Sequence, residues 1–160
     1  MDPESHGPNA KDLALRRLTV REYSSVELQG YLRRKGVSGA DARAVVLELE
    51  ERGLIDPGRY AAAIARSQIA RGKGPRAVLA KLKRRGLKAD LGTARRIYDT
   101  EAGGSGLTEL EAVRRVISSR FPGLDVSDRK AVARVYRFLN NRGFSAETIC
   151  SALDTTSSSG

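Results

Sequence analysis

The chain is poor in the residue types from which catalytic and metal sites are usually built. Its 160 residues include one His, one Cys, one Met and no Trp. One His and one Cys cannot complete a zinc site, and Cys150 has no nearby His to activate its thiol. The sequence therefore predicts no cofactor, no metal and no enzymatic activity. We expect His6 to be incidental and Cys150 to be a small packed side chain.

Long apolar runs are also missing. No stretch approaches the roughly 18 apolar residues that a membrane span needs, and a single Cys suits a reducing cytosol. These features predict a soluble, cytoplasmic protein that makes no membrane contact. Aromatic residues form only 5% of the chain, which favours thin helical layers over one thick core. Without a large uninterrupted apolar face, a monomer is the expected state.

Positive charge is abundant and unevenly distributed. The formal net charge is +10, and residues 56–100 hold 12 Lys/Arg against 3 Asp/Glu. The flanking thirds are close to balanced. Such a local excess predicts a polyanionic partner, which is either nucleic acid or an acidic protein surface.

Helix-capping signals punctuate most of the chain. Ser24 and Glu27 have the spacing of a capping box, and Asp56 precedes a proline suited to a first helical turn. Glycines at 36, 53, 86 and 143 stand where left-handed residues end helices, and no strand alternation is convincing. The sequence predicts nine helices, at about residues 10–22, 25–35, 39–52, 57–71, 75–85, 89–101, 107–119, 128–141 and 146–153.

The nine predicted helices fall into three similar sets. In the second helix of each set, apolar residues precede a closing glycine by eight and by four positions, at Gly36, Gly86 and Gly143. This repetition predicts an all-α fold of three tandem three-helix repeats forming an elongated, curved stack. The predicted parts are a disordered tail (1–9), repeat 1 (10–55), basic repeat 2 (56–101), a flexible linker (102–106), repeat 3 (107–153) and a disordered tail (154–160).

The most specific pattern lies within residues 53–86. It begins with Gly53-Leu54-Ile55-Asp56, continues through Tyr60-Ala61 and a basic Arg71-Gly72-Lys73-Gly74-Pro75 turn, and ends at Gly86. This pattern resembles the central signature of the RecX regulatory family, and the likeness extends over about residues 10–153. Four positions depart from the usual family residues, namely Pro57, Tyr60, Gln68 and Lys81.

The resemblance carries expectations about function. It implies a protein that binds in the groove of the RecA–DNA filament and inhibits RecA ATPase, recombinase and coprotease activities. Such a protein modulates DNA repair, homologous recombination and the SOS response. Single-stranded DNA would be contacted weakly or within the filament. Capping, disassembly and an inactive held filament all stay open as mechanisms.

The expected contacts lie on the basic helix at 75–85 and around it. On a helical wheel Val78 and Leu82 share one face, and most of the cationic residues occupy the other. A plain solvated helix face is the alternative explanation, and the turn at 71–75 could be a simple connector or a phosphate-binding turn. The candidate residues for binding RecA filament or DNA are Arg66, Arg71, Lys73, Arg76, Lys81, Lys83, Arg84 and Arg85, with Arg33, Arg34 and Lys35 secondary.

Two other functional classes compete with the filament regulator. A sequence-independent DNA-binding protein acting without RecA would bind bare DNA tightly and with a steep salt dependence. An enzyme would need a catalytic constellation that the sequence does not offer. Strong binding to assembled filament with weak binding to bare DNA distinguishes the regulator from the first rival.

Overall fold

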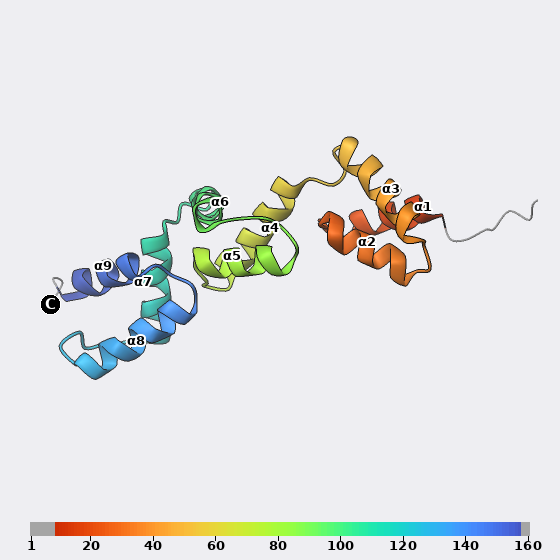
Figure 1. Ribbon diagram of the computed structural model, residues 1–160. Helices are drawn as coiled ribbons and strands as arrows, with labels where there is room; N and C mark the ends of the chain where they lie inside the picture. Colours follow the sequence, from red (N-terminus) through yellow and green to blue (C-terminus); the bar gives the residue numbers. More distant parts are fainter. Residues whose placement is uncertain (1–8, 158–160) are drawn as a thin grey trace, which may run out of the picture. The chain divides into compact units, whose positions relative to one another are not determined.

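The structure is a computed structural model that describes residues 9–157. Within this range all regular structure is helical, which confirms the predicted all-α class (Figure 1). The helices are α1 (Ala10–Leu18), α2 (Ser25–Arg34), α3 (Gly39–Glu51), α4 (Pro57–Ala70), α5 (Pro75–Arg84), α6 (Leu91–Gly103), α7 (Glu109–Arg120), α8 (Arg129–Asn141) and α9 (Ala146–Ser157).

Helix starts follow the local capping chemistry. The Ser24 hydroxyl accepts from the Glu27 amide and the Glu27 carboxylate accepts from the Ser24 amide, both at 3.2 Å. The predicted capping box is therefore confirmed. At α4 a carboxylate oxygen of Asp56 accepts from the amides of Gly58 and Arg59 at 2.8 and 3.1 Å. These acceptors satisfy amide groups that an isolated helix start leaves unpaired.

The glycine-rich segment at residues 102–106 contains the end of α6. Helix α6 itself continues to Gly103, and Gly106 adopts a left-handed φ of 70°. The Leu107 amide then donates to the Ala102 carbonyl at 2.9 Å. This bond closes the helix end as a Schellman motif, which needs glycine at the left-handed position. The flexible linker predicted at 102–106 stays a prediction, and its first two residues lie within α6.

Two predicted helix ends are wrong. Helix α1 ends at Leu18, because the chain turns at Thr19, whose hydroxyl donates to the Arg16 carbonyl at 2.8 Å. Helix α9 extends to Ser157, so the disordered tail predicted from 154 is helical over 154–157. No glycine or proline interrupts that segment. Most of the predicted N-terminal tail, residues 1–8, lies outside the described residues.

The chain packs as two compact units. The first contains residues up to Ala61 together with Arg84–Leu87, and the second contains Ala62–Lys83 and the residues from Lys88 onward. In the first unit α1, α2 and α3 pack on one another. Their shared core consists of Ala14, Tyr23, Leu28, Leu32, Ala42, Val46, Leu49 and Ile55.

The second unit contains a larger apolar core formed mainly by α7, α8 and α9. Helix α9 packs against both α7 and α8, and Phe144 is completely buried where α8 turns into α9. The core residues are Val113, Val116, Ile117, Val135, Leu139, Phe144, Ile149, Ala152 and Leu153. The division into two compact units reflects how the chain packs and does not test the three-repeat organisation. The predicted repeat boundaries and the elongated stack therefore stay predictions.

Candidate partner-binding surfaces

Helix α5 presents the predicted basic face. Val78 and Leu82 are buried, and Lys83 and Arg84 are exposed. The apolar stripe therefore packs inward while charge gathers on the solvent side, as the helical wheel predicts. An exposed cationic pair of this kind suits an anionic partner.

Arg76, although it belongs to the same helix, is held by its own molecule. Its Nη2 atom lies 2.6 Å from Oδ1 of Asn140, 3.0 Å from the Asn140 carbonyl and 2.7 Å from the Phe144 carbonyl. The side chain thus joins α5 to the turn between α8 and α9. Its charge remains near solvent, but its position serves the packing of the second unit.

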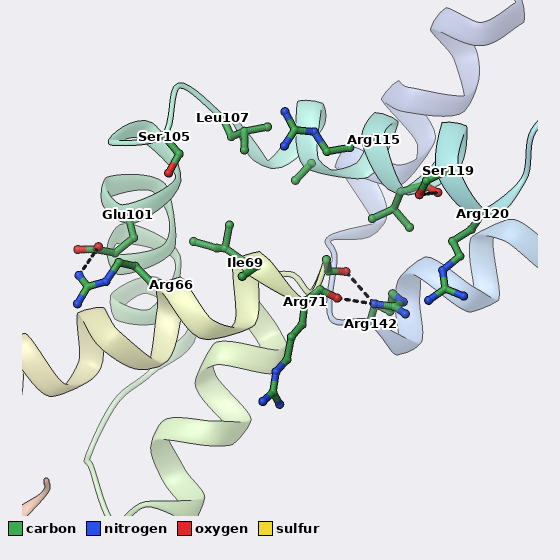
Figure 2. A pocket seen from close by; sticks show the side chains of 14 residues that line it. Arg66, Ile69, Arg71, Glu101, Ser105, Leu107, Arg115, Ser119, Arg120 and Arg142 are labelled. Atoms are coloured by element: carbon green, nitrogen blue, oxygen red, sulfur yellow. Dashed lines mark hydrogen bonds and ion pairs between the residues drawn. The ribbon is translucent and has the colours of Figure 1, made fainter. Parts of the chain in front are cut away.

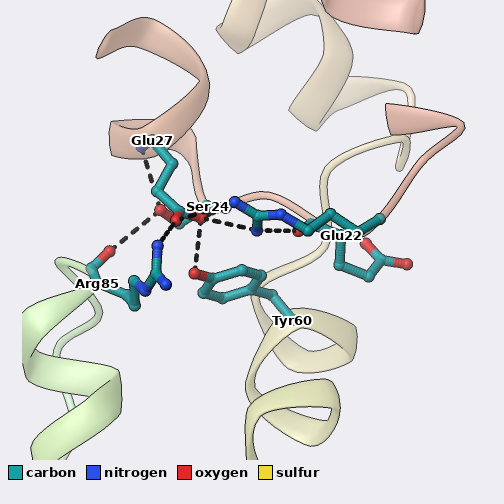
Figure 3. Close-up of polar contacts among 6 residues, drawn as sticks. Glu22, Ser24, Glu27, Tyr60 and Arg85 are labelled. Atoms are coloured by element: carbon teal, nitrogen blue, oxygen red, sulfur yellow. Dashed lines mark hydrogen bonds and ion pairs between the residues drawn. The ribbon is translucent and has the colours of Figure 1, made fainter. Parts of the chain in front are cut away.

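Arg85 is anchored in a polar cluster of the first unit (Figure 3). Its guanidinium pairs with the carboxylate of Glu27, which also accepts the Tyr60 hydroxyl at 2.6 Å. The Ser24 hydroxyl donates to the Arg85 carbonyl at 3.1 Å. The Nη2 atom of Arg21 lies 3.4 Å from Oε1 of the same carboxylate. Arg85 therefore holds the start of α2 and the start of α4 together with the end of α5.

The charges in this cluster are coupled. Burial alone would raise the pKa of Glu27, but hydrogen bonds from Tyr60, Arg21 and the Ser24 amide outweigh burial and lower it. Burial, the hydrogen bond to Glu27 and its negative charge raise the pKa of Tyr60 to about 12. Glu27 is thus held ionised, with Tyr60 as a neutral donor.

The basic turn at residues 71–75 is an interhelical connector whose amides are already used. The Gly74 amide donates to the Arg142 carbonyl at 2.9 Å, and the Arg76 amide donates to the Gly143 carbonyl at 3.0 Å. In return Nη1 of Arg142 donates to the Arg71 carbonyl at 2.7 Å. These contacts occupy amides that a phosphate-binding turn would need, so the connector interpretation is favoured.

The remaining predicted residues differ in exposure. Lys73 and Lys81 are half-buried, whereas Arg33, Arg34 and Lys35 are exposed at the end of α2. The first two belong to the second unit and the last three to the first. Their roles in binding stay predictions.

The structure also shows a cleft in the second unit, here named the arginine cleft (Figure 2). It has a volume of about 540 Å³, within the range of about 300–1,000 Å³ common for ligand sites. Arg66 and Glu101 pair at 2.7 Å at one end, and Figure 2 shows Arg120 and Arg142 at the other. The lining residues are Arg66, Ile69, Ala70, Arg71, Gly72, Glu101, Ser105, Leu107, Ala112, Arg115, Val116, Ser119, Arg120 and Arg142.

Sequence reasoning identified only part of this cleft. Arg66 and Arg71 were among the predicted binding residues, whereas Arg115, Arg120 and Arg142 were not. The available signal was the pair Arg115 and Arg120 beside the small residues Ala112 and Ser119 on α7. The charge count did not reveal this signal, because acidic residues nearly balance basic ones over residues 101–153.

Other chemistry is sparse in the part of the chain that the structure describes. No group of three or more His, Cys, Asp or Glu residues is placed to hold a metal ion there. Cys150 is exposed and not packed as predicted, because its neighbours Ile149 and Leu153 occupy the buried face of α9. None of the described helices is both long and apolar enough to cross a membrane.

Comparison with known families agrees with the helical arrangement. The model for the first three-helix domain of RecX matches residues 10–49, the second matches residues 58–93 and the third matches residues 108–153. The chain belongs to the RecX family. The resemblance in residues 53–86 therefore reflects membership, and the predicted three-helix character is confirmed.

Relatives named Regulatory protein RecX align over nearly the whole chain. The protein of Halorhodospira halophila is 33% identical over 142 residues, covering 89% of this chain and 84% of the relative. The protein of Pseudomonas fluorescens is 35% identical, and the alignment covers 82% of this chain and 81% of the relative. The protein of Acidithiobacillus ferrooxidans is 32% identical, and the alignment covers 93% of this chain and 90% of the relative. These relatives are named as regulators and not as enzymes.

Solved structures share the fold. The crystal structure of RecX from Lactobacillus salivarius has a TM-score of 0.71 at 18% identity and covers 91% of this chain and 93% of its own. A crystal structure of regulatory protein RecX has a TM-score of 0.69 at 19% identity, and the match covers 91% of this chain and 71% of that structure's chain. At these identities the likeness concerns the RecX fold alone.

Proposed function

We propose that this chain is a RecX-type regulator that binds in the groove of the RecA–DNA filament and inhibits RecA ATPase, recombinase and coprotease activities. The single observation that carries the proposal is the match of all three RecX domains along one chain. The protein then acts in the cytoplasm, on DNA repair, homologous recombination and the SOS response.

Exposed cations support a binding role without catalysis. Lys83 and Arg84 on α5 and the run Arg33–Lys35 on α2 are available to a partner. Several such contacts on one chain reinforce one another, because the first contact raises the effective concentration of the next. Inhibition then follows from occupying and bridging filament subunits, which requires no reacting group.

The test is the rate of ATP hydrolysis by RecA on single-stranded DNA, titrated with this protein at physiological salt. Binding to the same DNA without RecA is measured in parallel. We expect inhibition at protein concentrations well below that of the RecA subunits, with weak binding to bare DNA. Inhibition that appears only when the protein saturates free DNA would favour the DNA-binding protein that needs no RecA.

A further inference from the structure

The arginine cleft combines a positively charged rim with an aliphatic floor. Five arginines and a single carboxylate line it. Between them lie Ile69, Leu107 and Val116, which come from α4, from the segment before α7 and from α7. Figure 2 shows Ile69 between the Arg66–Glu101 pair and Arg142. A site of this composition suits a ligand that carries both negative charge and an apolar group.

The arginines of the rim are not equally available. Arg66 is paired with Glu101, and Arg142 donates to the carbonyls of Arg71 and Gly72 at 2.7 and 3.3 Å. Within the described residues, the guanidinium groups of Arg115 and Arg120 make no hydrogen bond and no ion pair within 4 Å. The pKa of Glu111 is lowered mainly by hydrogen bonds from the Thr108 amide and hydroxyl, and the charge of Arg115 makes a smaller contribution at longer range.

Two exposed arginines without close partners therefore border the apolar floor. Each guanidinium offers a planar set of donors that binds a carboxylate through two parallel hydrogen bonds. Beside these donors, Arg142 fixes the end of α4 to the turn before α9 and so holds one wall of the cleft in place. Charge complementarity therefore selects an anionic occupant.

The chemistry of the floor distinguishes between anionic partners. Proteins that bind single-stranded nucleic acid usually offer aromatic side chains on which bases stack. None of the residues lining the arginine cleft is aromatic. The floor is instead aliphatic, and it can receive a Leu, Ile or Phe side chain from a protein.

We propose that the arginine cleft binds an acidic peptide segment of a partner protein, with an apolar side chain on the floor formed by Ile69, Leu107 and Val116. Arg115 and Arg120 bind flanking carboxylates of that segment. This contact is additional to the α5 surface, and it does not depend on the proposed action on RecA.

The experiment is fluorescence anisotropy with the full chain and labelled 12-residue probes at low and physiological salt. The main probe contains Asp and Glu around a central Leu-Phe pair. A second probe replaces the acids by Asn and Gln, a third replaces Leu-Phe by Gly-Ser, and a fourth is a dT oligonucleotide of 12 nucleotides. We expect the first probe to bind about tenfold more tightly than each of the others.

Variants locate the binding. Arg115→Gln with Arg120→Gln is expected to weaken binding of the first probe about tenfold. The matched control, Arg43→Gln with Arg134→Gln, removes two exposed arginines outside the cleft and is expected to change binding less than about twofold. Circular dichroism checks that both variants keep their helical content.

Three results would overturn the proposal. The first is an equal loss of affinity for the acidic probe in both double variants. The second is a dT probe that binds more tightly than the acidic probe and depends on Arg115 and Arg120. The third is no binding of the acidic probe even at low salt. The second result would make nucleic acid the occupant. Because RecA is absent from this experiment, its failure is distinguishable from a failure to inhibit RecA ATPase.

Discussion

Gly74 and Gly143 meet backbone to backbone. A Cβ atom added to Gly74 would lie 2.6 Å from the carbonyl carbon and oxygen of Gly143, and one added to Gly143 would lie 2.5 Å from the Ala77 amide nitrogen. Two backbone hydrogen bonds, Gly74 to Arg142 and Arg76 to Gly143, and the side chains of Arg76 and Arg142 surround this contact. The turn after α4 and the turn after α8 are therefore fixed to each other, which positions the arginine cleft.

This contact predicts that Gly74→Ala destabilises the protein. The clash is with backbone atoms, which cannot rotate away as a side chain can, so we expect the free energy of unfolding to fall by about 1–3 kcal/mol. Urea unfolding followed by circular dichroism measures the change. Gly39→Ala is the control, because a Cβ there would meet nothing within 4 Å. Equal midpoints for the two variants would contradict the close approach.

We expect two buried tyrosines to affect the free energy of unfolding differently when their hydroxyl groups are removed. Tyr60 donates to Glu27, whereas among the described residues the buried Tyr98 hydroxyl lacks a hydrogen-bond partner. Tyr60→Phe should lower the free energy of unfolding by about 1–2 kcal/mol. Tyr98→Phe should leave it unchanged or raise it by up to about 1 kcal/mol. Chemical denaturation of both variants tests this pair, and a larger loss for Tyr98→Phe would refute it.

The polar cluster around Glu27 predicts a pH dependence of stability. Burial opposes ionisation, but the hydrogen bonds lower the folded-state pKa below the ordinary value of 4.5. Stabilisation by Glu27 is therefore complete above about pH 4.5 and is lost as the pH falls through the lowered folded value. Glu27→Gln should lower stability at neutral pH and flatten its decline on acidification.

Thermal unfolding measured from pH 7 down to pH 3 tests this linkage. Glu51→Gln, which changes an exposed glutamate of α3, is the control and should keep the slope of the wild-type protein. An unchanged slope for Glu27→Gln would mean that other carboxylates determine the acid sensitivity.

Local structure could be predicted from the sequence where neighbouring residues determine it. The Ser24–Glu27 capping box and the left-handed Gly36 and Gly143 depend on residues within about one helical turn. The buried face of α5 followed from the spacing of Val78 and Leu82. The helix end closed by Gly106 was not predicted, because a glycine-rich run is compatible both with flexibility and with such an end.

The binding site was less predictable, because charge counts treat all arginines alike. Arg76 bonds to Asn140, 64 positions away, and Arg85 pairs with Glu27, 58 positions away. No local pattern signals such contacts. The arginine cleft likewise combines residues of α4, α6, α7 and the turn after α8, so its rim depends on tertiary packing that periodicity cannot supply.

These anchored arginines decide how the proposed RecA-binding surface should be altered. Reversing the charge of Arg76 would also break its bonds to Asn140 and Phe144, so lost inhibition could reflect altered packing. Lys83→Glu with Arg84→Glu changes only exposed positions of α5. We expect this double variant to require about tenfold more protein for half-maximal inhibition of RecA ATPase.

The matched control for that variant is Lys130→Glu with Arg134→Glu, which reverses two exposed charges on α8. The control keeps the same net charge as the α5 variant, so any nonspecific attraction to the DNA-bound filament changes equally in both. Inhibition reduced only by the α5 variant would support a contact through Lys83 and Arg84. Equal reduction in both would mean that overall charge governs association, because a localised contact must depend on where the charge lies.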